Sequence, residues 1–319
     1  MSAVKSVLVL GGTGFVGRAV CERLTERSAS TRIIVPTRRN PRGNSVRLLP
    51  TVELVNADVN DAASLARLVA GCDAVLNLVA RLHGSRAEFE AVHVQLPQQL
   101  VQACKAAGVR RIVHVSALGV GPDAPSNYLR SKAAGEALLL ASGLDVTVLR
   151  PSVIFGAQDR FLNLFAQLQA LVPLIPLAAS QARLQPVWVE DVASAIVRCI
   201  DEPGSIGKTF ECAGPRHYSL AELVRLAGRW SGHERPQLPL PQWAGRLQAL
   251  LMELAPGEPL LSRDNLDSMR VSNVASDELP GLQALGITPA ALEAVAPAYL
   301  GDLFTRPDLD RWRAGAGRA

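Results

Sequence analysis

Short runs that are apolar at every position alternate with amphipathic segments through the first half of the chain. In the amphipathic segments, apolar side chains recur three and four residues apart, as along one face of a helix. Fully apolar runs predict strands buried on both faces, which is typical of a parallel sheet covered by helices. We therefore expect an α/β fold, a doubly wound (Rossmann) parallel sheet with its binding crevice at the carboxyl ends of the strands. The predicted strands are residues 6–10, 32–35, 52–55, 74–80, 111–117 and 146–149, and the longer predicted helices are residues 87–107 and 128–141.

The pattern loosens after Pro151, where prolines separate shorter segments. A late strand at 209–213 and helices at 242–254, 263–271 and 289–300 indicate a smaller, mostly helical lobe. We expect a sheet domain over residues 1–155, this smaller C-terminal lobe, interleaved with the crevice, over residues 156–312, and a tail over residues 313–319.

One of these helices, residues 242–254, is amphipathic. Its apolar side could lie on a membrane or a partner, but a surface helix normally buries that side in its own core. We therefore expect it to pack against its own lobe. The apolar residues concerned are Trp243, Leu247, Leu250, Leu251 and Leu254.

The most informative local motif is the glycine-rich segment from Gly11 to Gly17, which lies between the first strand and the first helix. Its spacing is G-x-x-G-x-x-G. Residues without a Cβ allow backbone amides to approach a pyrophosphate, whose charge then meets the helix N-terminus. The setting therefore predicts a dinucleotide site and makes residues 1–155 an NAD(P)-binding domain. The predicted contacts in the motif are Gly11, Thr13, Gly14, Phe15 and Val16.

The end of the second strand bears on which nicotinamide cofactor fits. An NAD site usually has an acidic residue about 20 residues after the glycines, but here the chain reads Thr37-Arg38-Arg39-Asn40. Guanidinium groups suit a 2′-phosphate, so we predict NADP(H), or NADPH/NADP, in preference to NAD. The alternative is that one or both arginines only face solvent.

Further contacts are expected where the next strands end. Asp58 either accepts a hydrogen bond from the adenine amino group or is an N-cap-type turn residue before a helix at 62–69. The predicted contacts at these strand ends are Asp58, Val59, Val79, Ala80, Arg81 and Pro151.

Tyr128 and Lys132 form a Y-x-x-x-K pair on one face of a predicted helix. An ammonium beside a phenol stabilises the phenolate and can also bind a cofactor ribose. Tyr128 would then act as general acid or base on a carbonyl or carbinol oxygen. Ser116, at the end of the fifth strand, is the candidate third hydroxyl.

Composition excludes several classes of protein. The chain has 319 residues, of which 48% are hydrophobic, so it can bury a large core. A nucleic-acid surface needs clustered basic charge together with aromatic residues, and aromatic residues make up only 4% of this chain, so we expect no nucleic-acid partner despite the net charge of +4. Five scattered cysteines and five histidines without ligand spacing argue against disulfides and a metal site.

The sequence also bears on location. No run of 18 apolar residues is present, which predicts no transmembrane span. A strand that starts at residue 6 leaves no room for a signal peptide. We therefore expect a cytoplasmic protein. The alternative is a peripheral protein at the cytoplasmic face of the inner membrane.

Together these motifs resemble the extended or atypical short-chain dehydrogenase/reductase superfamily, over essentially the whole chain. The segments that carry the resemblance are Gly11–Gly17, the Tyr128/Lys132 pair, Leu149–Gly156 and Val189–Ala193. Within it, other strings resemble the branch of the NADPH-binding, dehydrogenase-like accessory subunit of respiratory complex I (NADH:ubiquinone oxidoreductase) and its bacterial relatives. Those strings are Asn77–Val79, Tyr128–Ala133, Pro186–Val189, Leu285–Pro289 and Leu292-Glu293.

The resemblance implies a different role from the bare motif. Active extended members carry the third hydroxyl one position after a serine at this strand end, and that position here is Ala117. The complex I subunit holds NADPH tightly and is thought to use it structurally. A structural NADPH-binding protein tied to complex I or quinone metabolism is therefore the first hypothesis. An active NADPH-dependent oxidoreductase of reductase or epimerase type is the second, and a nucleotide-sensing regulator is the third.

Overall fold

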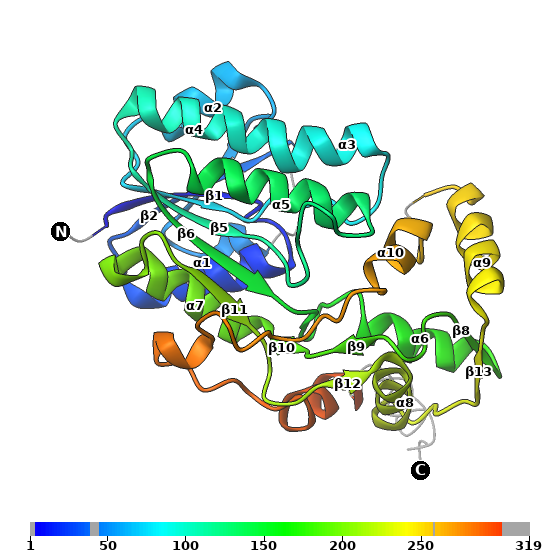
Figure 1. Ribbon diagram of the computed structural model, residues 1–319. Helices are drawn as coiled ribbons and strands as arrows, with labels where there is room; N and C mark the ends of the chain where they lie inside the picture. The colour runs from blue at the N-terminus through cyan, green and yellow to red at the C-terminus, as the bar shows by residue number, and fades with distance from the viewer. Residues whose placement is uncertain (1–3, 39–44, 258, 302–319) are drawn as a thin grey trace, which may run out of the picture.

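A computed structural model of the chain describes residues 4–38, 45–257 and 259–301. Seven parallel strands form one sheet in the order β11-β6-β5-β4-β1-β2-β3 (Figure 1). The order reverses between β1 and β4, the switch point at which doubly wound folds bind ligands. The expected Rossmann sheet is thus confirmed. Its strands are β1 (Ser6–Leu10), β2 (Arg32–Thr37), β3 (Val52–Asn56), β4 (Ala74–Asn77), β5 (Arg111–Val115), β6 (Asp145–Pro151) and β11 (Thr209–Cys212).

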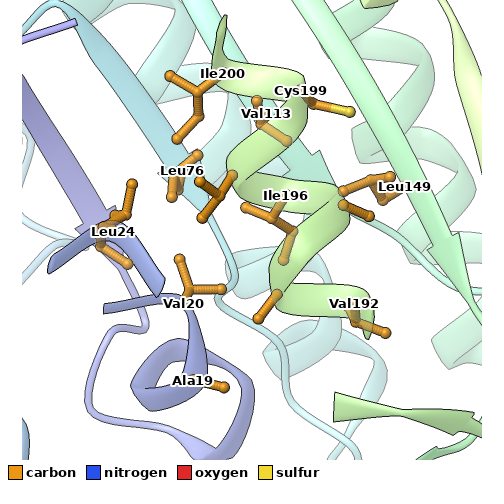
Figure 2. Close-up of a cluster of buried hydrophobic side chains, with 14 of the residues drawn as sticks. Ala19, Val20, Leu24, Leu76, Val113, Leu149, Val192, Ile196, Cys199 and Ile200 are labelled. Atoms are coloured by element: carbon orange, nitrogen blue, oxygen red, sulfur yellow. The ribbon is translucent and has the colours of Figure 1, made fainter. Parts of the chain in front are cut away.

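Helices cover both faces of this sheet (Figure 1). One face is covered by α1 (Phe15–Arg27) and α7 (Val189–Asp201), and the other by α2 (Ala62–Val69), α4 (Leu96–Ala107) and α5 (Asn127–Leu140). Figure 2 shows Val20 and Leu24 of α1 and Ile196 of α7 packed against strand residues such as Leu76 and Val113. Burying each such side chain contributes about 1.5–3 kcal/mol.

The long helix predicted at 87–107 forms with one irregularity. It comprises α3 (Arg86–Glu90), a π-helical turn η2 (Ala91–Gln95) and α4. Gly135 of α5 lies against the His93 carbonyl oxygen, where a Cβ would overlap it. The close helix crossing therefore depends on this glycine.

The second half of the chain contributes to the sheet and also builds the smaller lobe. Both α7 and β11 lie in the central layers, because α7 packs on α1 and β11 pairs with β6. The lobe is built around buried side chains of α6 and α8. The elements outside the central layers are β7 (Ile154–Phe155), α6 (Leu162–Leu171), β8 (Ile175–Leu177), β9 (Arg183–Leu184), β10 (Val187–Trp188), β12 (Tyr218–Ser219), α8 (Leu220–Trp230), β13 (Gln237–Pro239), α9 (Gln242–Leu254) and α10 (Arg263–Ser268), the 3₁₀ turns η1 (Ser45–Leu48), η3 (Pro203–Ser205) and η4 (Leu282–Leu285), and a helical stretch at 292–301.

Three strands end earlier than predicted, and one helix packs differently. The strands predicted at 74–80, 111–117 and 209–213 stop at Asn77, Val115 and Cys212. The backbone N–H groups of Leu78 and Ser116 still donate to the carbonyls of Leu10 and Leu149, so the chain leaves the first two strands gradually. The helix predicted at 242–254 forms with those bounds, but its expected packing is wrong: its large apolar side chains are exposed. Among the described residues, no helix is long and apolar enough to cross a membrane.

Candidate functional site

The glycine-rich turn after β1 is closed by its own backbone. The Gly14 N–H donates to the Gly11 carbonyl over 3.0 Å, and Gly11 has a φ of +84°, which favours glycine. A Cβ on Gly17 would overlap the Gly11 oxygen and lie 2.6 Å from the Gly12 Cα. A side chain at Gly17 would therefore prevent the helix from starting this close to the strand.

The N-terminus of α1 lacks a side-chain cap. The N-cap residue is Gly14, which has no side chain that could accept a hydrogen bond from the helix. The first turn also contains no acidic residue. Thr13 and Gly14 are exposed. Among the described residues, five other α-helices have caps that accept a backbone N–H, namely Asp61, Ser85, Ser126, Ser219 and Ser262. The free N–H groups of α1 suit a pyrophosphate, so the residues present fit the predicted cofactor.

The chain after β4 lies directly against the glycine turn. A Cβ on Gly11 would lie 3.1 Å from the Leu78 carbonyl carbon and 3.2 Å from the Val79 nitrogen. The Val79 N–H donates to Oδ1 of the buried Asn77 over 3.3 Å, which fixes the turn out of the strand. The predicted contact Val79 thus lies beside the turn, and Ala80 is the next residue along the chain.

Arg81 is engaged on the protein side. Its guanidinium pairs with Glu88 over 2.7 Å and donates to the His83 carbonyl over 2.7 Å. Its backbone N–H donates to Nε2 of His93 over 3.1 Å. Arg81 thus fixes the path of the chain after β4, and its charge is already paired.

Arg38 is exposed directly after β2. Strand β2 itself packs against the glycine turn, since a Cβ on Gly12 would lie 2.8 Å from a methyl carbon of Val35 on β2. Arg38 therefore stands at the sheet edge that carries the turn, beside the position where an adenosine ribose binds in such folds. The second predicted arginine, Arg39, lies outside the described residues.

Asp58 and Val59 follow β3. One Asp58 carboxylate oxygen accepts from the Asn60 backbone N–H over 3.0 Å and from its side-chain amide over 2.9 Å. Asp61 is the N-cap residue of α2, and Asp58 makes its side-chain hydrogen bonds in the turn just before that helix, which agrees with its alternative role as a turn residue. Asp58 is exposed and Val59 packs partly against the core.

The Tyr128/Lys132 pair lies on α5 as predicted, and the lysine is turned toward the backbone. Lys132 is 2% exposed, and its Nζ donates to the Val115 carbonyl over 2.6 Å. The hydroxyl of Ser116 is buried and has no hydrogen-bond partner within the described residues. Lys132 and Ser116 therefore meet at the end of β5, but no hydrogen bond joins the Ser116 hydroxyl to Tyr128 there.

Burial changes the ionisation of both members of the pair. It raises the pKa of Tyr128 to about 12 and lowers the pKa of Lys132 to about 8. Glu136 opposes the lowering of the Lys132 pKa, and it is itself paired with Arg150 over 2.5 Å. At neutral pH the phenol keeps its proton, so Tyr128 is suited to donate a proton rather than to accept one.

His93 belongs to this site, although its spacing in the sequence gave no signal. Nε2 accepts the Arg81 backbone N–H, so the ring proton lies on Nδ1, which donates to the Ser131 hydroxyl over 2.8 Å. The ring meets Tyr128 edge-on at 5.5 Å, and burial lowers the pKa of His93 to about 3. A neutral His93 thus links the chain after β4 to the tyrosine helix.

Asp264 is a second residue that sequence reasoning missed. It lies on α10 in the smaller lobe and accepts the backbone N–H groups of Asn127 and Tyr128 over 2.7 and 3.0 Å.

The predicted contact Pro151 ends β6, where its carbonyl accepts the Leu118 N–H over 3.0 Å. The loop after β5 is thereby tied to β6.

The smaller lobe contains a cavity of about 270 Å³. It lies between the β8–β9 connection, α9 and α10, and its charged lining residues are Arg246, Asp267 and Arg270. Ala179 in this lining has a φ of +50°. Across the described residues, no cluster of His, Cys, Asp and Glu could hold a metal ion.

A glycine turn and an uncapped helix at the switch point, with a Y-x-x-x-K pair near the end of β5, are typical of nucleotide-binding α/β proteins. The model of the NAD dependent epimerase/dehydratase family matches residues 7–213, and the chain belongs to this family. It is therefore a member of an NAD(P)-binding family, as the resemblance in its motifs predicted.

Two relatives and one solved structure are similar to this chain, and the first of them belongs to the predicted branch. The chain is 36% identical over 305 residues to "NADH dehydrogenase [ubiquinone] 1 alpha subcomplex subunit 9, mitochondrial" of Mus musculus, with 92% of this chain and 79% of that protein covered. It is 30% identical to "Ceramide reductase" of Caulobacter vibrioides over 74% of this chain and 73% of that protein. The NADPH-dependent quinone oxidoreductase QOR2 of Escherichia coli, solved with NADPH, shares the fold with a TM-score of 0.74 at 22% identity, over 93% of this chain and 99% of that one.

Proposed function

We propose that this protein binds NADP(H) tightly and uses it as a structural element of a respiratory NADH:quinone oxidoreductase. The observation that carries the cofactor proposal is the uncapped N-terminus of α1 beside an exposed Arg38, with no acidic residue between Thr37 and Asn40. A pyrophosphate would bind the free N–H groups, and Arg38, with Arg39, would bind the 2′-phosphate.

The arrangement at the end of β5 supports a structural rather than a catalytic use of the cofactor. One N–H of the Lys132 ammonium is directed to the Val115 carbonyl, and the Ser116 hydroxyl has no partner among the described residues. The next position, where active relatives would carry a hydroxyl, is Ala117. A phenol with a pKa of about 12 also lacks the tuning that a general base needs.

The complex I partner is proposed from the relatives. The Mus musculus protein and its counterpart in Rattus norvegicus, also 36% identical, are both named as subunits of NADH dehydrogenase [ubiquinone]. A peripheral place on such a complex, at the cytoplasmic face of the inner membrane, would agree with the lack of a spanning helix among the described residues.

A second candidate function is an NADPH-dependent oxidoreductase of reductase or epimerase type, acting on a carbonyl or quinone-like substrate. The observation that favours it is the protonated Tyr128 one helical turn from the buried Lys132. Bound NADPH would supply the hydride. Tyr128 would donate the proton to the substrate oxygen, Lys132 would stabilise the phenolate left behind, and Ser116 would hold that oxygen.

A turnover assay distinguishes the two functions. The full chain is loaded with NADPH, and its absorbance and fluorescence are followed with short quinones and small carbonyl compounds as acceptors. The proposal predicts bound NADPH that neither oxidises nor exchanges readily. Steady oxidation that is lost in Tyr128→Phe would establish the enzyme instead.

A further inference from the structure

The helix α9 presents its large apolar side chains to the outside. Trp243 is 72% exposed and Leu254 is 75% exposed, at the two ends of the helix. Its inner face carries small residues: Gly245 lies against Ala178, and Ala249 is fully buried. A surface helix normally has the opposite arrangement, with large apolar residues inside. Packing of the lobe therefore does not explain the outer residues of α9, which also include Leu247, Leu250 and Leu251.

Further large apolar side chains are exposed in segments next to the helix. Leu238 on β13, just before α9, is 49% exposed, and Leu260, just after it, is 53% exposed. Leu174 precedes β8, the strand that pairs with β13, and is also exposed. Figure 1 shows α9 at the margin of the smaller lobe, next to β13 and β8. An exposed apolar surface of this kind marks an interaction site.

The outer face of α9 carries no charge. The two charged residues of the helix both point to its flanks: Arg246 pairs with Asp267 over 3.5 Å, and Glu253 pairs with Arg263 over 2.9 Å. Glu253 also accepts the Arg263 backbone N–H over 2.7 Å. A partner of this face is therefore held by apolar contact rather than by complementary charge.

The length and width of the face argue for a lipid occupant. Trp243, Leu247, Leu250 and Leu254 alone would form a narrow seam, but it covers less than two heptads, while a coiled coil needs three or four. Leu251, which is 62% exposed on the same helix, lies beside this seam and widens the apolar face. A helix of 13 residues is about 20 Å long, which suits a position in the plane of a bilayer. Trp243 at one end is typical of the membrane interface.

We propose that α9 docks on the surface of a lipid bilayer, with its outer leucines among the acyl chains and Trp243 at the headgroup level. The docking depends on apolar burial, so it takes place on zwitterionic lipid and changes little with salt. It does not depend on the cofactor or on the function proposed above.

Flotation with vesicles tests this proposal directly. The full chain is mixed with phosphatidylcholine vesicles, with and without phosphatidylglycerol, and the bound fraction is measured at low and high salt. We expect the protein to float with both, and Leu247→Asp with Leu251→Asp to lower the partition coefficient by about tenfold or more for each leucine. Leu48→Asp is the matched control, because Leu48 is 85% exposed on η1 and lies outside this surface. It should float like the original protein.

A second measurement guards against misfolded variants. The tryptophan emission of the unaltered chain should shift to shorter wavelength with phosphatidylcholine vesicles, and Trp243→Phe should remove that shift. Thermal melting of each variant verifies that it is folded. No flotation of the unaltered protein, flotation only with anionic vesicles at low salt, or equal flotation of the double aspartate variant would each overturn the proposal. So would a dimer in vesicle-free solution that the same aspartates dissociate.

Discussion

Asp264 accepts the backbone N–H of Tyr128, with 3.0 Å between Oδ2 and the nitrogen. Its other oxygen accepts from the backbone and side-chain nitrogens of Asn127, over 2.7 and 3.0 Å. The helix that carries the candidate tyrosine thus begins against a carboxylate from the smaller lobe, in addition to its own cap Ser126. A negative charge at a helix N-terminus is stabilising, so this contact fixes the start of α5.

Removing this carboxylate should loosen the start of α5. We expect Asp264→Ala to lower the free energy of unfolding by about 1–3 kcal/mol, because two backbone N–H groups lose a charged acceptor. Asp264→Asn, which keeps an acceptor oxygen, should lose less. Urea unfolding of both variants measures the effect, with the exposed Asp123→Ala as the control. An Asp264→Ala protein as stable as that control would contradict the assigned contact.

The buried Lys132 should make stability depend on alkaline pH. Its pKa in the folded protein is lowered to about 8, so between about pH 8 and its ordinary value near 10.5 the unfolded chain binds more protons. Stability contributed by this group therefore rises through that window, by about 1.4 kcal/mol per pH unit at most, and is lost as the pH falls toward 8. The measurement is the difference in unfolding free energy between the protein and Lys132→Met across these pH values. A difference that does not change with pH would refute the assignment.

His93 should have a corresponding effect on the acid side. Burial lowers its pKa from 6.5 to about 3, so the unfolded chain binds a proton that the folded chain refuses between these values. Stability should fall as the pH drops below about 6.5, by about 1.4 kcal/mol per pH unit for this residue. The fully buried His114, whose pKa burial also lowers, should add to the slope. Denaturant unfolding between pH 7 and about 5 should show a smaller slope in His93→Asn than in a variant of the exposed His217.

The cysteines should be unreactive in the folded protein. All five are free and buried, and burial raises the pKa of Cys21 and Cys104 to about 12 and that of Cys199 to about 11. Since the thiolate is the reactive form, a disulfide reagent at pH 8 should modify none of them quickly. The same reagent in denaturant should titrate five thiols. Rapid modification without denaturant would show that one of these side chains is accessible.

Local features of this site could be predicted from sequence alone. The glycine spacing places Gly11 and Gly17 in a strand–turn–helix, and the i, i+4 spacing places Tyr128 and Lys132 on one helix face, because both patterns involve neighbours along the chain. The parallel, doubly wound sheet follows from the alternation of strands and helices, whereas the order of its strands was not predicted. The direction of the Lys132 ammonium toward the Val115 carbonyl could not be predicted, because it depends on side-chain packing at the end of β5.

Two further kinds of feature could not be predicted from the sequence: contacts between segments far apart in the chain, and which side of α9 packs against the protein. Asp264 and Tyr128 are separated by 136 residues, and His93 meets Ser131 across 38, with no local pattern to pair them. For α9 the sequence correctly predicts an apolar face, but periodicity does not tell which side meets the protein. Gly245 and Ala249 decide that, because only small residues allow the close approach to the lobe.

The most direct test of the proposed cofactor site is a calorimetric titration of the full chain with NADPH and with NADH. We predict that NADPH binds more tightly, and that Arg38→Ala weakens NADPH by about tenfold or more while changing NADH little, since a charge-assisted hydrogen bond to the 2′-phosphate is lost. Arg198→Ala, which removes an exposed arginine of α7, should leave both affinities unchanged. NADH binding as tight as NADPH binding, or no binding of either nucleotide, would contradict the account.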